Sequence, residues 1–293
     1  MFTIKVPATT ANMGPGYDVL GMALQLYNEY EIERIPKGVE FLGCDHIALE
    51  ENLVYTTMNK VLERYGYKAD GLRVVAKQND IPMSRGLGSS AACIAGGIII
   101  ANSLMDDRLS VDDIIRIGTE IEGHPDNIVP AVIGGMTVSI FENEQVFYTK
   151  VQVPDALRFV VMIPDFTIST HEARKVVPDH YTKADCIYNI SRVAMLLAAM
   201  NNGEVEKLRA ATEDKIHQPY RVPLITDADK IFRHARCLGA KAEVISGSGS
   251  TLLAMIDKEN KDFDKRMQAF LNKLENKWEA KVLEVDTKGA QIL

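Results

Sequence analysis

The sequence predicts an α+β protein with two domains. The chain has 293 residues, and at ~150 residues per domain this length favours two domains. Segments with strand-like alternation and segments with helical spacing are interleaved, without an internal repeat. Val151–Asp155, which contains a proline, is the candidate boundary, and it divides the chain into 1–153 and 154–293. We expect mixed sheets rather than a doubly wound parallel sheet, because the second half combines βαβ-like and antiparallel elements.

The first half is expected to begin with strands. Residues 2–6 are an apolar strand, and 27–35 alternates glutamates with Tyr30, Ile32 and Arg34, which is typical of a half-buried strand. The other expected elements are a helix at 53–65, a strand at 72–76, helices at 89–104 and 111–121, and strands at 135–141 and 145–151. Gly, Pro and Asn in 123–127 predict a connection there.

The second half is expected to contain four strands and four helices. The strands are predicted at 159–163, 242–245, 252–256 and 280–285, and the helices at 184–200, 205–212, 225–238 and 262–276. The glycine-serine run Ser246–Ser250 joins two of these strands and is expected to be a loop.

Composition excludes several classes of protein. The net charge is −7 at pH 7, whereas nucleic-acid binders are usually basic. The most apolar stretch, Ala91–Met105, is interrupted by glycines and polar residues and is too short for the ~20 residues of a membrane span. Four cysteines without a CxxC pattern favour free thiols in a reducing compartment. We therefore expect a cytoplasmic protein with neither a nucleic-acid nor a membrane partner.

The most informative local pattern is the glycine-serine loop Pro82–Ala92. Glycine allows a backbone to approach a ligand closely and to adopt positive φ. The two serines stand where a helix is expected to start, and the N-terminus of a helix carries partial positive charge and free N–H groups. This combination predicts a phosphate cradle.

Other cradles and a purely structural role are alternatives for this loop. It lacks the Lys-Ser/Thr pair of a Walker A motif, and the chain has no protein-kinase signatures. Gly86-x-Gly88-x-x-Ala91 matches the dinucleotide-binding pattern, but the strand at 72–76 ends too early and Pro82 intervenes. Taken alone, the loop is as compatible with a purely structural tight turn before an ordinary helix as it is with a phosphate cradle.

Three blocks together resemble the GHMP kinase family (galactokinase, homoserine kinase, mevalonate kinase and phosphomevalonate kinase). They are Pro7–Asp18, Pro82–Ala92 and Ile245–Thr251, in the order and spacing of that family. Glu120–Asn127 and Ser169–Arg174 further resemble the branch that phosphorylates homoserine in threonine biosynthesis. The resemblance covers nearly the whole chain. It implies an N-terminal domain with the phosphate loop, a C-terminal ferredoxin-like α/β sandwich, and ATP and Mg²⁺ as cofactors.

The resemblance also implies the nucleotide and metal residues. Ser89 and Ser90 would contact the triphosphate, and Ser90 and a glutamate would hold Mg²⁺. Glu120 matches the position of that glutamate best and Glu122 second, although a solvated surface carboxylate is the common fate of Glu. The full expected nucleotide site is Pro82, Met83, Ser84, Arg85, Gly86, Leu87, Gly88, Ser89, Ser90, Ala91 and Ala92, with Asn52 beside the adenine.

The implied substrate site suits an amino acid. Arg174 and Arg221 would bind a carboxylate, because a guanidinium offers it a bidentate fork. The ammonium or hydroxyl end would face Asn12, Asp18 and Asp126, and His124, Asn127, Thr170 and Gly247 would complete the pocket.

The residues implied in catalysis are Ser90, Glu120, Asp126, Asn127 and Thr170. Asn127 occupies the position where the mevalonate and galactose relatives have an aspartate base. We therefore expect catalysis by positioning and charge neutralisation, with Asp126 orienting the substrate, which a loose phosphoryl-transfer transition state permits. Another small-molecule kinase (of mevalonate or shikimate), a dinucleotide-binding dehydrogenase and a non-catalytic binding protein are the alternatives. The oligomeric state, a homodimer included, is left open.

Overall fold

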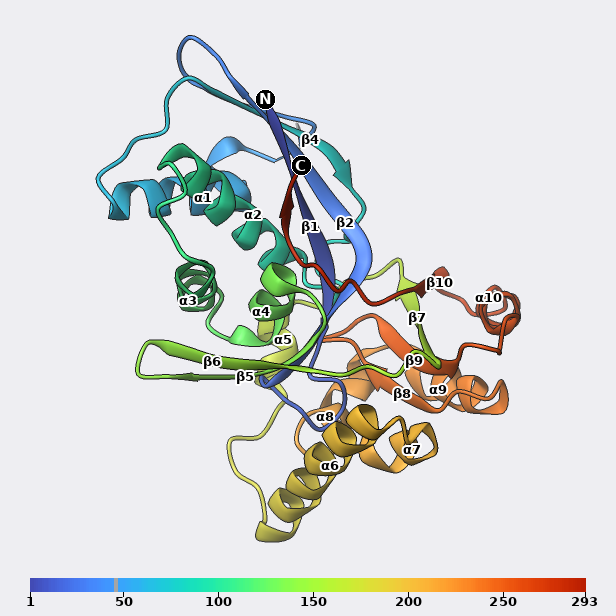
Figure 1. The fold of residues 1–293 in the computed structure, drawn as a ribbon. Helices are drawn as coiled ribbons and strands as arrows, with labels where there is room; N and C mark the ends of the chain where they lie inside the picture. Colours follow the sequence, from blue (N-terminus) through green and yellow to red (C-terminus); the bar gives the residue numbers. More distant parts are fainter. Residues whose placement is uncertain (45–46) are drawn as a thin grey trace.

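The computed structural model describes residues 1–44 and 47–293. Its first sheet has the strand order β11-β1-β2-β4-β3, and β5 joins it by pairing with both β2 and β6 (Figure 1). These strands are β1 (Phe2–Ala11), β2 (Leu20–Arg34), β3 (Val39–Leu42), β4 (Leu72–Asn79), β5 (Met136–Glu142), β6 (Gln145–Val151) and β11 (Gln291–Ile292). Only the β3–β4 pair is parallel among these described strands.

Four helices pack together against this sheet. They are α1 (Leu53–Arg64), α2 (Ser89–Leu104), α3 (Val111–Glu122) and α4 (Pro125–Ile133), and a short 3₁₀ turn (Leu49–Glu51) precedes α1. Their apolar faces and those of β1 and β2 form the larger hydrophobic core. Because α2 is made almost entirely of small and apolar residues, it is buried along most of its length. Its first turn, Ser89 and Ser90 included, follows the glycine loop and lines a cavity.

The second sheet has the antiparallel order β10-β7-β9-β8. Its strands are β7 (Leu157–Pro164), β8 (Ala242–Ile245), β9 (Leu252–Asp257) and β10 (Trp278–Leu283). In chain order this is 4-1-3-2, with helices in the connections after the first and third strands. That is a ferredoxin-like arrangement, and it confirms the expected α+β fold with two packed units.

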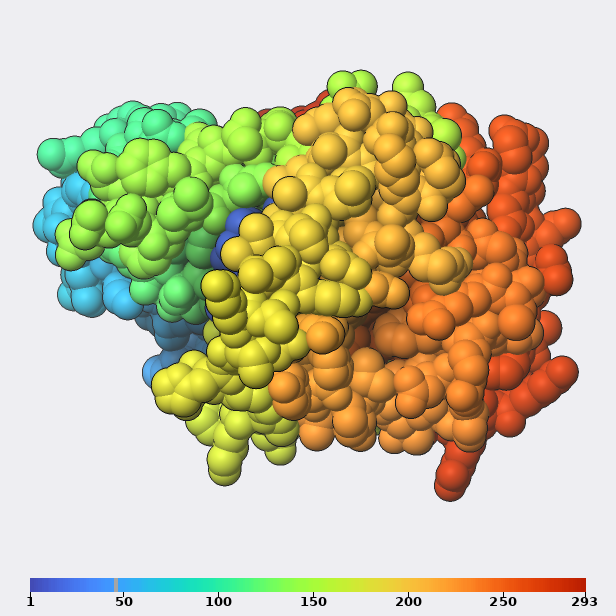
Figure 2. Space-filling model, turned by 90° about the horizontal axis from the view of Figure 1, so that it is seen from below, coloured from blue at the N-terminus to red at the C-terminus, as the bar shows by residue number. Residues whose placement is uncertain are grey.

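Most helices of the second half lie between β7 and β8 in the sequence. They are α5 (Thr170–Lys175), α6 (Lys183–Asn202), α7 (Leu208–Ala211), α8 (Gln218–Arg221) and α9 (Ala228–Cys237), with 3₁₀ turns at Val205–Lys207 and Val222–Leu224, and α10 (Phe263–Leu271) follows β9. Seen from below, this half makes up the larger part of the face in view, with the N-terminal half to one side (Figure 2).

The end of the chain returns to the first sheet. Val285 bridges to Leu24, and β11 pairs with β1. The domain boundary at 153/154 stays a prediction. It does not account for the end of the chain, because Val285 and β11 lie with the N-terminal strands.

The predicted helices at 53–65, 89–104 and 111–121 are confirmed within a residue. The prediction of a connection at 123–127 is wrong, because α4 begins there. Proline suits the first position of a helix, and Pro125 occupies it, while Ile128 and Val129 bury the helix against the core. Strand β2 begins at Leu20 rather than Tyr27, and α10 ends at Leu271 rather than Asn276. None of the helices described is long and apolar enough to span a membrane.

Candidate active site

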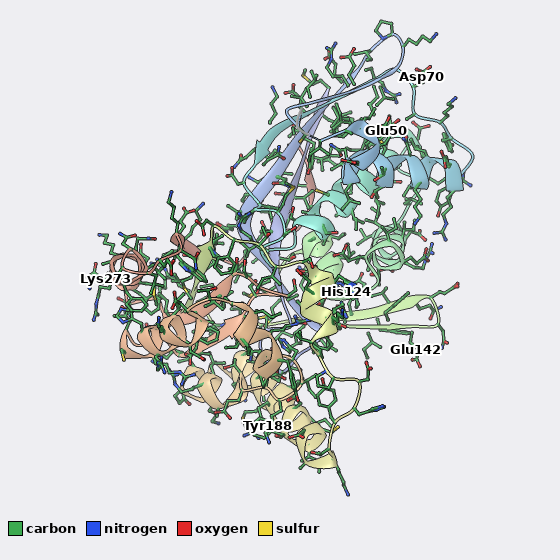
Figure 3. The ribbon with its side chains drawn as sticks, turned by 180° about the vertical axis from the view of Figure 1, so that it is seen from behind. Glu50, Asp70, His124, Glu142, Tyr188 and Lys273 are labelled. Carbon is green, nitrogen blue, oxygen red and sulfur yellow. The ribbon has the colours of Figure 1, made fainter. Side chains whose placement is uncertain are left out.

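A cavity of about 540 Å³ lies where the two halves meet. Segments far apart in the sequence line it: the loop after β1, the start of α1, the loop before α2, the start of α4, α5, α8 and the loop after β8. His124, which lies at this junction, marks its position in the whole molecule (Figure 3). One end is mostly backbone and small polar groups, and the other is crowded with charged side chains.

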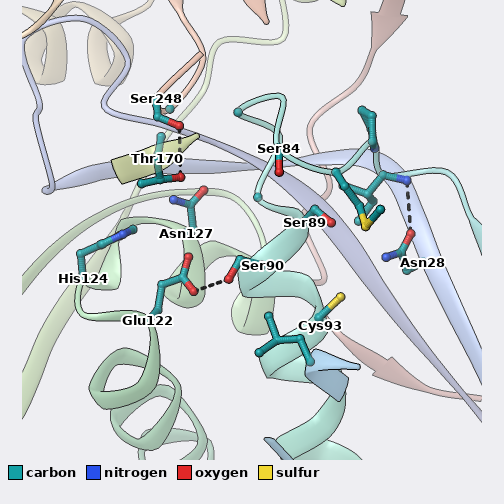
Figure 4. Close-up of a pocket in the computed structure, with 18 of the residues that line it drawn as sticks. Asn28, Ser84, Ser89, Ser90, Cys93, Glu122, His124, Asn127, Thr170 and Ser248 are labelled. Atoms are coloured by element: carbon teal, nitrogen blue, oxygen red, sulfur yellow. Dashed lines mark hydrogen bonds between the residues drawn. The ribbon is translucent and has the colours of Figure 1, made fainter. Parts of the chain in front are cut away.

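The backbone-rich end is formed by the glycine loop. Gly86 and Gly88 have φ of +74° and +68°, which glycine adopts without strain. A Cβ on Gly86 would lie 2.1 Å from the Ser246 carbonyl oxygen. Gly88 is the N-cap of α2 and supplies no side-chain acceptor, so the first N–H groups of this helix remain available to an anion. Ser84, Ser89 and Ser90 line the same end of the cavity (Figure 4).

Four residues expected in the nucleotide site do not line the cavity: Arg85, Leu87, Ala91 and Ala92. Arg85 Nε donates to the Pro164 carbonyl oxygen at 2.8 Å and Nη2 to that of Asp165 at 2.9 Å, so it ties the loop to the second half of the chain. Leu87 and the two alanines are buried beneath the loop. These residues support the cradle rather than forming its surface.

Glu122, rather than Glu120, faces the cradle. Ser90 Oγ donates to Glu122 Oε2 at 2.7 Å (Figure 4). Glu120 lies outside the cavity lining, and Arg64 Nη1 and Arg116 Nη1 each approach its carboxylate to 2.6 Å. Burial alone would raise the pKa of Glu120, but these two guanidinium groups outweigh it and hold the pKa below its usual range. Residues two apart in a helix point to nearly opposite sides. Glu120, which the resemblance favoured for the metal site, therefore points away from the cavity that Glu122 lines.

The charged end begins with the loop after β1. Arg174 on α5 binds both carboxylate oxygens of Asp18, at 3.0 and 2.8 Å. Asn12 fixes this loop, because its Oδ1 accepts from the Asp18 N–H at 3.0 Å and its Nδ2 donates to the Gly247 carbonyl oxygen at 2.8 Å. Asp18 and Arg174 therefore form an ion pair with each other. The family resemblance assigned them to opposite ends of the substrate and did not predict this pair.

Arg221 is the unusual cation of this end. Its side chain is buried, with 2% of the residue exposed, and it donates to the carbonyl oxygens of Ala173 (2.9 Å) and Gly247 (3.2 Å). Burial lowers its pKa, and no carboxylate among residues 1–44 and 47–293 forms an ion pair with it. A buried charge without a counter-ion is costly, so this guanidinium is suited to an anionic group of a ligand.

Two carboxylates and one imidazole gather beside Arg174. Ligand atoms of Asp18, His124 and Asp126 lie within 4.8 Å of one another. His124 Nδ1 lies 2.6 Å from Asp126 Oδ1. Burial alone would lower the pKa of His124, but the Asp126 carboxylate outweighs it and raises the pKa. The two carboxylates line the cavity and are suited to a cationic group of a ligand.

The remaining expected residues also line the cavity. Asn127 Oδ1 accepts from the Thr9 hydroxyl at 2.7 Å, and Thr170 Oγ1 lies 3.5 Å from Ser248 Oγ (Figure 4). Asn52 caps α1 by accepting from the N–H groups of Val54 and Tyr55, beside the apolar part of the cavity. The structure thus brings every expected substrate residue and Asn52 to one cavity.

Sequence reasoning missed two side chains here. The Tyr17 ring centroid lies 5.7 Å from the guanidinium carbon of Arg174 and 5.1 Å from that of Arg221. The same ring stacks on His217, with the two ring centroids 5.2 Å apart. Tyr17 lies inside a quoted motif, and His217 stands four residues before Arg221, one helical turn away. That spacing is the only signal that could have pointed to His217.

Comparisons with known proteins identify the family of this chain. Residues 52–135 match the GHMP kinases N terminal domain, and residues 195–273 match the GHMP kinases C terminal family. A homoserine kinase of Clostridium novyi is 53% identical over 100% of this chain and 99% of its own, and one of Clostridium kluyveri is 48% identical over 99% and 98%. A crystal structure of homoserine kinase from Cytophaga hutchinsonii has 25% identity and a TM-score of 0.87, covering 100% of this chain and 97% of its own. The chain belongs to the GHMP kinase family, among its homoserine kinases.

Proposed function

We propose that this protein transfers the γ-phosphoryl group of ATP to the side-chain hydroxyl of L-homoserine, forming O-phospho-L-homoserine for threonine biosynthesis. The names of its relatives support this activity. The structural observation that carries it is Arg221, a buried guanidinium without a carboxylate partner among the described residues, at the end of a cavity whose other end is a phosphate cradle.

The charged end matches the two ends of a zwitterion. The substrate carboxylate would bind Arg221, with Arg174 beside it, and the ammonium group would lie against Asp18 and Asp126. Mevalonate has no ammonium group to occupy the acidic cluster, and a neutral sugar would also leave the buried Arg221 guanidinium without an anionic partner. Unpaired buried charges are strongly unfavourable, so the site should discriminate against both.

The nucleotide would lie along the other end. Its triphosphate would contact the first turn of α2, where Ser89, Ser90 and free N–H groups point into the cavity. The base would lie near Asn52 and the adjacent apolar lining of Tyr30 and Ile81. The γ-phosphate would then lie between α2 and the charged end.

Mg²⁺ fits at Ser90 and Glu122. A hydroxyl and a carboxylate oxygen, 2.7 Å apart beside the phosphate cradle, are hard oxygen donors of the kind that Mg²⁺ takes from proteins, together with substrate phosphates. When bound there, the ion would neutralise charge on the phosphate oxygens. We do not assign this role to Glu120, which two arginines hold away from the cavity.

In the proposed reaction the homoserine hydroxyl oxygen bonds to the γ-phosphorus while the bond from that phosphorus to the β–γ bridging oxygen breaks, and ADP leaves. Asp126, held by His124, would accept the hydroxyl hydrogen bond and aim the oxygen, and Asn127 and Thr170 line the same cavity. The hydroxyl proton passes to an oxygen of the transferred phosphoryl group as the new bond forms, and from there to water, so the step uses no protein base. Positioning of this kind supplies most of the catalysis in phosphoryl transfer.

A coupled ADP-release assay across homoserine, mevalonate, galactose and shikimate tests the proposal. We expect turnover with homoserine alone, with a product of the mass of O-phosphohomoserine. Turnover of another substrate in its place would contradict the assignment, and tight binding of NADH rather than ATP would favour the dehydrogenase alternative.

We also propose a cytoplasmic protein, which its four free thiols support. Light scattering after gel filtration tests whether the chain forms the homodimer that the family resemblance leaves open.

A further inference from the structure

The orientation of Arg221 depends on neutral acceptors. Besides two carbonyl oxygens, its Nη1 lies 3.4 Å from His217 Nδ1, and its Nη2 lies 3.4 Å from the Tyr17 hydroxyl. Because a guanidinium is planar, these contacts determine which of its edges faces the cavity. His217 is fully buried and does not line the cavity itself.

The hydrogen bonds of His217 define its tautomer. Its Nε2 lies 2.7 Å from the Gly14 carbonyl oxygen, which can only accept, so Nε2 carries the hydrogen. Burial lowers the pKa of His217 well below its usual range, although Asp214 opposes this shift, so the ring is neutral. The Nδ1 lone pair is therefore left to accept from Arg221.

The imidazole also joins the two charged parts of the site. Gly14 belongs to the loop that carries Asp18, and Arg221 follows His217 on α8 (Figure 1). Asp214 accepts from the N–H groups of Ile216, His217 and Gln218 and so secures the turn before α8. One rigid ring thus spans the loop that would bind the ammonium group and the helix that would bind the carboxylate.

We propose that His217 is a positioning residue for substrate recognition: its Nδ1 holds the Arg221 guanidinium in the orientation that receives the substrate carboxylate. The inference rests on the proposed function, because it assumes an amino-acid substrate. It assigns a role to a residue that would contact neither the substrate nor ATP.

Two amide variants separate the two hydrogen bonds of the ring. In His217→Gln the longer side chain places its amide near Nε2, which retains donation to Gly14 but removes the acceptor for Arg221. In His217→Asn the amide lies near Nδ1, which retains an acceptor for Arg221 but loses Gly14. His234→Gln is the matched control, because His234 in α9 stacks on Phe270 of α10, outside the cavity.

We expect His217→Gln to raise the KM for homoserine about tenfold, since the lost hydrogen bond involves a charged donor, with the KM for ATP changed by less than a factor of about two. His217→Asn should raise the homoserine KM less, although it should lower the melting temperature more. A merely structural role would make the KM follow the melting temperature, and that result would overturn the inference.

The compound 3-amino-1-propanol, which is homoserine without its carboxylate, supplies a second readout. As a competitive inhibitor it should bind wild type and His217→Gln equally, because it makes no use of Arg221. Equal weakening of this amine and of homoserine would contradict the proposed route through the carboxylate. Failure of the wild type to phosphorylate homoserine would overturn the proposed function instead, whereas an active wild type with unchanged variants would overturn only the role of His217.

Discussion

The two ends of the cavity are built in opposite ways. The cradle comes from one contiguous segment, residues 82–90, whose glycines and serines present backbone N–H groups and hydroxyls to the cavity. The charged end draws on four separate segments, and its parts are side chains in an ion-pair and hydrogen-bond network that includes Asp18, Arg174 and Arg221. A phosphate is recognised by local backbone geometry, whereas an amino acid needs two opposite charges held at a set separation.

This contrast predicts different consequences of mutation. Changes at the cradle should act on the rate, because the cradle and the Mg²⁺ proposed beside it would contact charge that develops during transfer. Changes at the charged end should act on homoserine binding and leave ATP binding alone.

Glu122→Gln should lower kcat by about two to three decades, because it removes the carboxylate beside Ser90 from the proposed Mg²⁺ site. Ser90→Ala should act in the same direction. Glu120→Gln is the control, and it should change kcat by less than a factor of about three, because Glu120 lies with Arg64 and Arg116 outside the cavity. Steady-state kinetics under saturating substrates measure this, and the reverse ranking of the two glutamates would return the metal to Glu120.

Arg221→Leu should raise the homoserine KM on the order of 100-fold, because the substrate carboxylate would be left in a buried site without its partner. Arg174→Leu should cost about tenfold, since Arg174 is more exposed and already paired with Asp18. Arg221→Lys should rescue only in part, because an ammonium group cannot reproduce the bidentate fork.

The KM for ATP in the same arginine variants tests the separation of the two ends. It should change little in all of them. A uniform loss for both ligands would mean that the arginines serve the phosphates, and the contrast between the ends would then be wrong.

His124 should give the charged end a pH-dependent stability that the cradle lacks. The pKa of His124 is raised in the folded protein by Asp126, so protonated His124 stabilises the fold below its unfolded pKa of about 6.5. That contribution is lost as pH rises through the raised folded pKa. Melting temperatures of wild type and His124→Gln should therefore differ more at pH 5.5–6 than at pH 8, by calorimetry. Ser84→Ala, in the cradle, is the control. A difference in melting temperature that does not change with pH, or that Ser84→Ala shows to the same extent, would contradict this prediction.

The smallest expected effect concerns the N-termini of α5, at the charged end, and α2, at the cradle. The Ser169 side chain caps α5 with Glu172 in a capping box, whereas α2 begins at Gly88 without a side-chain cap. Ser169→Ala should cost about 1 kcal/mol of helix stability and raise the homoserine KM a few-fold, because α5 carries Thr170 and Arg174. The KM for ATP should not move, and an effect on ATP as large as that on homoserine would break the contrast.

The cradle was predictable from the sequence because its chemistry is local. Gly86, Gly88 and the serines are neighbours in the chain, and positive φ followed by a helix start is a property of a short segment. The helices that flank it were equally predictable, since their apolar spacing is a property of about a dozen residues each. The family resemblance added the substrate residues, which no local pattern identifies.

The tertiary structure alone decided what depends on separate segments meeting. It placed Glu122 rather than Glu120 beside Ser90, because the rotation of α3 relative to α2 is set by packing. It started a helix at Pro125 where a connection was predicted, because burial of Ile128 and Val129 outweighs the unfavourable local composition. It also paired Asp18 with Arg174 and joined His217 to both Gly14 and Arg221, contacts between residues as many as 203 positions apart. Sequence patterns record local conformation and burial, whereas the partner of a buried charge is determined only when the whole chain has packed.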